Sequence, residues 1–125
     1  MSHVEFDPEF VKAMNWLTPD ELLFLQEVAI ELVSAKLKFP DAELKLTAAT
    51  EELGEVAEAI LDKPWSEVRL ESVQVAATVC QLACLGDNSV RSYRTKRGLD
   101  YPFGTQATWL GQPLNYEESN NVRDT

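Results

Sequence analysis

The sequence predicts an all-α protein, and three observations lead to this prediction. The central part of the chain reads as three long segments whose apolar residues recur with helical spacing. Residues that start or stop helices bound these segments, and few stretches alternate as a half-buried strand does. Since the connections are short, we expect a bundle of three long helices with short flanking helices and an irregular C-terminal arm.

Length and composition are those of one globular domain. The chain has 125 residues, of which 45% are hydrophobic, and this is enough for one packed core. We expect a single domain over residues 1–125, with its helical core at about 19–86 and the arm at about 87–125. A short helix near 89–96 is expected at the beginning of the arm.

Two helices are expected in the N-terminal part. Asp7, followed by a proline, is suited to cap and begin a short helix that ends near Trp16. Thr18 and Glu21 stand three residues apart, with a proline at the first helical position, which is a capping-box pattern. The long helix that begins there should end at Phe39, because a residue before proline is pushed out of the α region.

Prolines and a glycine bound the next two long helices. One is expected from about 41 to about 62, where Pro64 prevents its continuation. Ser66 is suited to cap the other, which should run to Leu85 and stop at Gly86. A connection this short makes the two helices antiparallel neighbours.

The charge balance argues against two classes of partner. The chain holds 11 Lys and Arg against 21 Asp and Glu, a net charge of −10. Nucleic-acid binding requires cations that neutralise phosphates, and docking on anionic lipids has the same requirement. With neither a signal peptide nor a run of about 20 apolar residues that would span a bilayer, we expect a cytoplasmic protein that binds neither nucleic acid nor membranes.

Several kinds of catalytic site lack the residues they need. His3 is the one histidine of the chain, which nearly excludes His-ligated zinc sites and Ser-His-Asp triads. Neither glycine-rich phosphate-binding motif is present in the sequence. Cys80 and Cys84 lack the spacing of a paired zinc or redox motif, so buried free thiols are expected.

Glutamates gather on the helix expected at 41–62. Glu52 and Glu55 are neighbours on its surface because they stand three residues apart, and they flank the expected core stripe. That stripe consists of Leu46, Ala49, Leu53, Val56, Ala57 and Ile60. Glu51 and Glu58 are expected to point elsewhere, and a solvated polar face is the alternative interpretation of the whole run.

The third long helix is apolar almost all round, so it should be central and buried. Its polar residues Glu71, Gln74, Thr78 and Gln81 are spaced so that they form one line along one side. Buried polar groups need partners, so this line should face water, a basic partner or a metal ion. Clustered carboxylates repel one another unless a cation joins them, and their oxygens suit Mg²⁺ or Mn²⁺. The pattern suggests metal-assisted chemistry on a phosphate ester or anhydride.

Two groups of acidic residues carry a family resemblance. The run Glu51, Glu52 and Glu55, followed about fifteen residues later by Glu71 and Gln74, resembles the EExxE…ExxD signature of the MazG-like, all-α nucleoside triphosphate pyrophosphatases. The resemblance covers roughly residues 22–86 and is strongest to the short, single-domain members that are common in phages and bacteria.

The resemblance implies a fold and an activity. The family hydrolyses nucleoside triphosphates between the α and β phosphates, which gives a nucleoside monophosphate and pyrophosphate. It implies Mg²⁺ or Mn²⁺ held by Glu52, Glu55 and Glu71, with Gln74 at the fourth ligand position. Glu51 matches the first Glu of the motif, which in some relatives helps to orient or deprotonate the attacking water. The resemblance also implies a homodimer or a homotetramer.

Gln74 departs from the family pattern, which has Asp at this position. A glutamine offers a carbonyl oxygen but removes one negative charge, so it should hold a cation less strongly. The alternatives are a weaker site, a site with fewer ions, or a relative without turnover that still binds nucleotide or metal. A helical module whose acidic face binds a basic protein is a further alternative.

Basic residues cluster just after the third long helix. Arg91, Arg94 and Lys96 are suited to bind the phosphates of a triphosphate, in their own chain or in a neighbouring protomer. A solvated basic linker is the alternative interpretation, and Lys36 and Lys38 are second candidates for phosphate binding. No residue pattern identifies the base that would be recognised.

Overall fold

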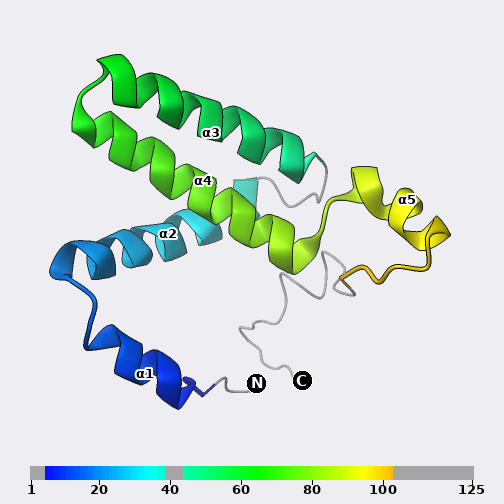
Figure 1. Cartoon of the computed structure of the whole chain (residues 1–125), viewed down its shortest axis with the longest axis horizontal. Helices are drawn as coiled ribbons and strands as arrows, with labels where there is room; N and C mark the ends of the chain where they lie inside the picture. The colour runs from blue at the N-terminus through cyan, green and yellow to red at the C-terminus, as the bar shows by residue number, and fades with distance from the viewer. Residues whose placement is uncertain (1–4, 39–43, 103–125) are drawn as a thin grey trace. The chain divides into compact units, whose positions relative to one another are not determined.

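Every regular element in the part of the chain that the computed structural model describes, residues 5–38 and 44–102, is helical. In chain order the elements are α1 (Pro8–Met14), α2 (Pro19–Lys38), α3 (Lys45–Asp62), α4 (Trp65–Leu85), the 3₁₀ turn η1 (Asn88–Val90) and α5 (Arg91–Lys96) (Figure 1). The prediction of an all-α protein with three long helices and short flanking helices is confirmed for these residues.

Contacts divide the described residues into two compact units. The first includes α1 and the beginning of α2, up to Glu27, and the second runs from Val28 to the last described residue, Pro102. The boundary between the units therefore falls inside α2. All residues of the candidate site belong to the second unit.

Hydrogen bonds at the first two helix starts confirm the predicted caps. The Oδ1 atom of Asp7 accepts a hydrogen bond from Glu9 N at 2.9 Å. In the capping box, Thr18 N donates to Glu21 Oε1 at 2.8 Å, and Glu21 N donates to Thr18 Oγ1 at 3.1 Å. The predicted end of α2 at Phe39 lies outside the described residues.

The main packing contact of the second unit is a hairpin of α3 and α4, the two green helices that lie side by side in Figure 1. Pro64 separates them, because proline cannot continue a helix. α4 ends at Leu85, and Gly86 follows with a φ of 93°, a backbone conformation that favours glycine. Both predicted boundaries are confirmed.

Two predicted helix starts are wrong. α3 begins at Lys45 rather than near 41, because Leu44 has a left-handed φ of 54° that interrupts helical geometry. α4 begins at Trp65 rather than after a cap at Ser66, and Pro64 stands at the N-cap position without a side-chain hydrogen bond. Proline is suited to a helix start because its φ is fixed and it has no N–H to satisfy.

The predicted core stripe of α3 is only partly right. Ala49 of that stripe is buried, as is Ala59 outside it, whereas Leu46, Leu53 and Ile60 of the stripe are each more than half exposed in the single chain. The hairpin packs along the alanine side because small side chains let two helices approach closely.

α4 is buried on one side only. Its buried residues are Val68, Val73, Ala77, Gln81 and Leu85. Leu70 and Val79 are about half exposed, so the prediction of a central, fully buried helix is only partly right. By length and composition alone, α4 is long and apolar enough to cross a membrane. The expectation that no segment is long and apolar enough to span a bilayer is therefore not met. A core helix of a soluble protein passes the same test.

Asp87, just after the end of α4, accepts a hydrogen bond from the first turn of α3. Leu44 supplies no side-chain cap to α3, and the buried Asp87 carboxylate instead accepts a hydrogen bond from Leu46 N at 2.9 Å. Asp87 also accepts from Ser89 N at 2.9 Å and from Ser89 Oγ at 2.6 Å. These bonds begin the predicted short helical segment, observed as η1 and α5. The arm beyond Pro102 lies outside the described residues.

Candidate functional site

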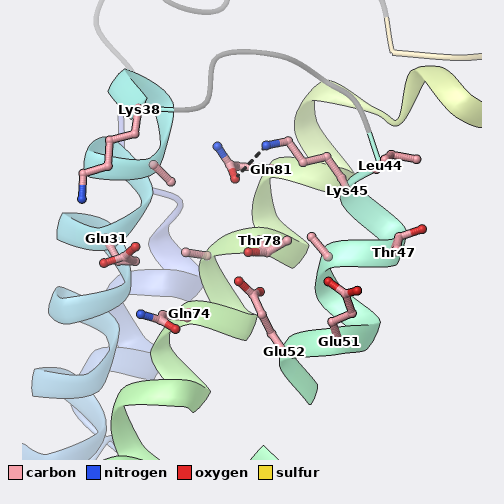
Figure 2. Close-up of a pocket in the computed structure, with 13 residues that line it drawn as sticks. Glu31, Lys38, Leu44, Lys45, Thr47, Glu51, Glu52, Gln74, Thr78 and Gln81 are labelled. Atoms are coloured by element: carbon pink, nitrogen blue, oxygen red, sulfur yellow. Dashed lines mark hydrogen bonds between the residues drawn. The ribbon is translucent and has the colours of Figure 1, made fainter. Parts of the chain in front are cut away.

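A pocket of about 720 Å³ lies among the second half of α2, α3 and α4, within the second unit (Figure 2). Its charged lining residues are Glu31, Lys38, Lys45, Glu51 and Glu52. Small-molecule sites commonly have volumes of about 300–1,000 Å³, so the pocket has room for a ligand the size of a nucleotide.

Three of the four residues in the polar line of α4 face this pocket. Gln74, Thr78 and Gln81 all line it, whereas Glu71 does not. The expectation that the polar line of α4 must face something is therefore met for these three. The carboxyl group of the fourth residue, Glu71, instead interacts with those of Glu55 and Glu52 on α3.

Glu52 projects from α3 into the pocket beside Thr78 (Figure 2). Burial raises the pKa of its carboxyl, and a hydrogen bond from the Thr78 side chain opposes this effect. The negative charges of Glu55 and Glu31 raise the pKa further, and the positive charge of Lys45 lowers it. The Oε1 atom of Glu52 is buried without a hydrogen-bond partner. An unpaired buried acceptor is costly, so this position is suited to a cation or a donor.

Glu71 of α4 lies against Glu55 of α3. Burial raises the pKa of the Glu71 carboxyl, and a hydrogen bond between the two carboxyl groups raises it further. The negative charges of Glu55, Glu67 and Glu52 act in the same direction. Two carboxyl groups share a hydrogen bond only when one of them holds a proton. The three predicted ligands Glu52, Glu55 and Glu71 therefore interact with one another.

The chemistry of these carboxylates suits a hard divalent cation. Glu52 and Glu71 each keep one buried oxygen without a hydrogen-bond partner, and carboxylate oxygens are the ligands that Mg²⁺ takes. Among residues 5–38 and 44–102, no group of three or more His, Cys, Asp or Glu is arranged to hold a metal ion. Mg²⁺ usually keeps several waters and uses one or two carboxylates together with substrate phosphates, so these residues fit an ion shared with a substrate.

Glu51 lines the pocket, although it was expected to point elsewhere. Thr47 and Ala48 of α3 also line the pocket wall. Glu51 is exposed, so it is accessible to water. Gln74, the residue at the fourth ligand position, lines the same pocket from α4.

The basic residues expected to bind phosphates do not line this pocket. Arg94 Nε donates to the carbonyl oxygen of Asp100 at 2.9 Å, and its guanidinium lies 3.4 Å from the Asp100 carboxylate. The Arg91 guanidinium lies over the ring of Tyr101, 5.2 Å from the ring centre. Lys96 is exposed at the end of α5. All three belong to the region of α5 rather than to the pocket wall.

The lysines that line the pocket are Lys38 and Lys45. Lys38 was a second candidate for phosphate binding, whereas neither Lys45 nor Glu31 was predicted to lie at the site. Helical spacing carried a signal for both. Lys45 stands seven residues before Glu52, and Glu31 stands seven before Lys38, so each pair shares one face of its helix.

Neither cysteine lines the pocket. Both thiols are free, as expected. Cys80 is half-buried and Cys84 is exposed, so the expectation of buried thiols is wrong for Cys84. Burial raises the pKa of the Cys80 thiol. The single histidine, His3, lies outside the described residues.

No family model matches the chain, and neither a curated protein nor a solved structure matches it at a significant level. The resemblance to MazG-like pyrophosphatases therefore rests on the motif residues themselves. The metal ions and the activity that it implies stay predictions.

Proposed function

We propose that the protein is a MazG-like nucleoside triphosphate pyrophosphohydrolase that depends on Mg²⁺ or Mn²⁺. It converts a nucleoside or deoxynucleoside triphosphate and water into the monophosphate and pyrophosphate. The observation that carries the proposal is the electrostatic interaction of Glu52, Glu55 and Glu71 across two neighbouring helices. Two of these residues, Glu52 and Glu71, keep an unpaired buried oxygen, and Glu52 lines a pocket of nucleotide size.

In this proposal Glu52, Glu55 and Glu71 hold the divalent cation, with the carbonyl oxygen of Gln74 as a further ligand. The bound cation supplies positive charge that offsets the charge on phosphate oxygens and on the leaving pyrophosphate. Thr78 donates a hydrogen bond to Glu52 and so holds that carboxylate toward the pocket. The weaker charge of this ligand set, with Gln in place of Asp, leaves more of the cation's charge for the triphosphate.

Glu51 acts as the general base in this proposal. It lines the pocket and is exposed, so a water bound there can give it a proton. The oxygen of that water attacks the α phosphorus, and the bond between the α phosphorus and the bridging oxygen breaks. The electron pair of that bond leaves with pyrophosphate, and the monophosphate carries the new oxygen.

The proposal includes a homodimer or homotetramer. The exposed apolar side chains Leu46, Leu53 and Ile60 follow one side of α3, and a stripe of this kind is commonly covered by a partner. In such an assembly, Arg91, Arg94 and Lys96 are proposed to bind phosphates in the pocket of a neighbouring protomer.

The alternative is a relative that binds nucleotide or metal without turnover. Gln74 favours this alternative, because it lines the pocket at the position where the family signature has Asp. Such a protein would still be stabilised against heat by a nucleotide with Mg²⁺, because a ligand that binds the folded state shifts the unfolding equilibrium. It would release no product.

Product analysis tests the proposal. The full chain is incubated with each of the common nucleoside and deoxynucleoside triphosphates, with Mg²⁺, with Mn²⁺ and with a chelator. We expect monophosphate and pyrophosphate in equal amounts, and no product with the chelator. Diphosphate and inorganic phosphate would contradict attack at the α phosphorus. Heat stabilisation without any product would identify the binding-only relative.

A further inference from the structure

Gln81 of α4 is buried in the pocket wall with an unpaired donor. Only 2% of its surface is exposed, and its Oε1 atom accepts a hydrogen bond from Lys45 Nζ at 3.4 Å. Its Nε2 atom is buried and has no hydrogen-bond partner. Leaving a buried donor unpaired destabilises a fold, so a polar side chain kept in this position indicates a ligand that completes it.

The contact with Lys45 determines which way round the Gln81 amide lies. An ammonium group has donors only, so the amide oxygen must face Lys45 and the amide nitrogen must face away from it. Figure 2 shows this nitrogen on the side of Lys38, whose ammonium is also a donor-only group. A group that satisfies Gln81 beside two lysines must therefore be an acceptor.

The pocket has two ends of different chemistry. Lys38, Lys45 and Gln81 lie toward one end, which we call the donor end, while Glu52 and Gln74 lie away from it (Figure 2). We infer that the donor end binds an oxygen acceptor of the nucleotide. The opposite end, with Glu52 and Gln74, holds the part of the nucleotide that is bound to the metal ion. This inference rests on the proposed function. It gives Lys45 and Gln81 a role in binding the nucleotide, whereas the proposed function gives them none.

Two of the oxygen acceptors of a nucleotide would give different selectivity. One is the keto oxygen at C4 of uracil or thymine, or at C6 of guanine, and the other is a phosphate oxygen. Cytosine and adenine carry an amino group at the corresponding position, which would place donor against donor and would be rejected. A keto oxygen at Gln81 therefore gives base selectivity, whereas a phosphate oxygen gives affinity that is the same for every base.

Calorimetry with three probes distinguishes these sources. The probes are non-hydrolysable analogues of dUTP and dCTP and inorganic tripolyphosphate, each with Mg²⁺. Gln81→Met keeps the length of the side chain but removes its amide group, and Gln26→Met makes the same change at an exposed position of α2 outside the pocket wall and is the matched control. For Gln81→Met we expect about a tenfold loss of affinity. A loss for the dUTP analogue alone identifies a keto oxygen, and an equal loss for all three identifies a phosphate.

The outcomes separate this inference from the proposed function. If wild type binds the probes and Gln81→Met binds them equally well, the inference is overturned and the proposed function stands. If wild type binds none of them, both are overturned. Should Gln81→Met fail to fold, Lys38→Met changes an exposed residue of the same end. Unchanged affinity in that variant would equally overturn the inference.

Discussion

The carboxylate of Asp87 is a buried charge that the fold itself satisfies. Burial raises its pKa, but hydrogen bonds from the Ser89 side chain and from the backbone of Leu46, Ser89 and Leu44 outweigh burial and hold the pKa below its ordinary value. A carboxyl group whose pKa is lower in the folded state than in the unfolded state stabilises the fold when the pH is above its unfolded-state pKa. That contribution is lost as the pH falls through the folded pKa.

Asp87→Asn should therefore destabilise the protein by about 2 kcal/mol at neutral pH, because the amide cannot replace a charged acceptor for several N–H groups. The free energy of unfolding, measured with denaturant, should differ most from wild type near neutrality. The difference should narrow below the ordinary aspartate pKa of about 3.9. Asp100→Asn changes an exposed carboxylate and is the control. Equal losses in the two variants would contradict this account of Asp87.

Gln74 gives a second prediction at the same scale. Gln74→Asp restores the missing negative charge, so the apparent dissociation constant for Mg²⁺ should fall by about tenfold. Without Mg²⁺ the same variant should unfold at a lower temperature, because another carboxylate joins Glu52 and Glu71. The Mg²⁺ affinity and the stability without Mg²⁺ are both obtained from the midpoint of thermal unfolding, measured at increasing Mg²⁺ concentrations. Gln26→Asp makes the same change at an exposed position of α2, and a Mg²⁺ response shared by both variants would argue against a site at Gln74.

At the scale of helices, the end of α4 depends on a glycine. Gly86 has a φ of 93°, and a Cβ there would lie 2.6 Å from the Tyr101 side chain. Gly86→Ala should therefore destabilise the protein by about 1–3 kcal/mol. Gly98, at a φ of 72° with nothing within 4 Å of a Cβ, is the matched control. Its alanine variant should lose less stability in the same denaturant titration, and a larger loss at Gly98 would contradict the argument.

Local signals predicted the first two helix starts and the ends of α3 and α4. Thr18 with Glu21, Pro64 and Gly86 act through neighbours in the chain, so their effect is visible in the sequence. The left-handed Leu44 was not predictable in this way, because Asp87, which caps this helix start, stands 41 residues away from Leu46.

The same distinction holds for the candidate site. The carboxyl groups of Glu52 and Glu55 interact, as their spacing predicted, and three of the four residues in the polar line of α4 face the pocket. Lys45 and Gln81 stand 36 positions apart in the sequence, so no local sequence pattern could predict their contact. The error in the α3 core stripe also has a physical cause, since helical spacing identifies an apolar side but not which neighbour covers it.

For the whole molecule, the exposed stripe on α3 predicts self-association. Leu53 is 59% exposed in the single chain, so Leu53→Glu should leave the fold intact while it removes the assembly, because a buried unpaired charge is costly at an interface. Sedimentation velocity should show a dimer or tetramer for wild type and a monomer for the variant. Leu99→Glu makes the same change outside α3 and should keep the assembly. A monomeric wild type would contradict the prediction.

The central claim is that the carboxylates between α3 and α4 catalyse release of pyrophosphate, and one comparison tests it most directly. Pyrophosphate is measured with Mg²⁺ and the best triphosphate of the panel, for wild type, Glu52→Gln and Glu58→Gln. Both variants remove one charge from α3, but Glu58 is exposed and does not line the pocket. We predict that Glu52→Gln lowers the rate by about 100-fold, while Glu58→Gln keeps the wild-type rate. Equal rates in wild type and Glu52→Gln would contradict the claim.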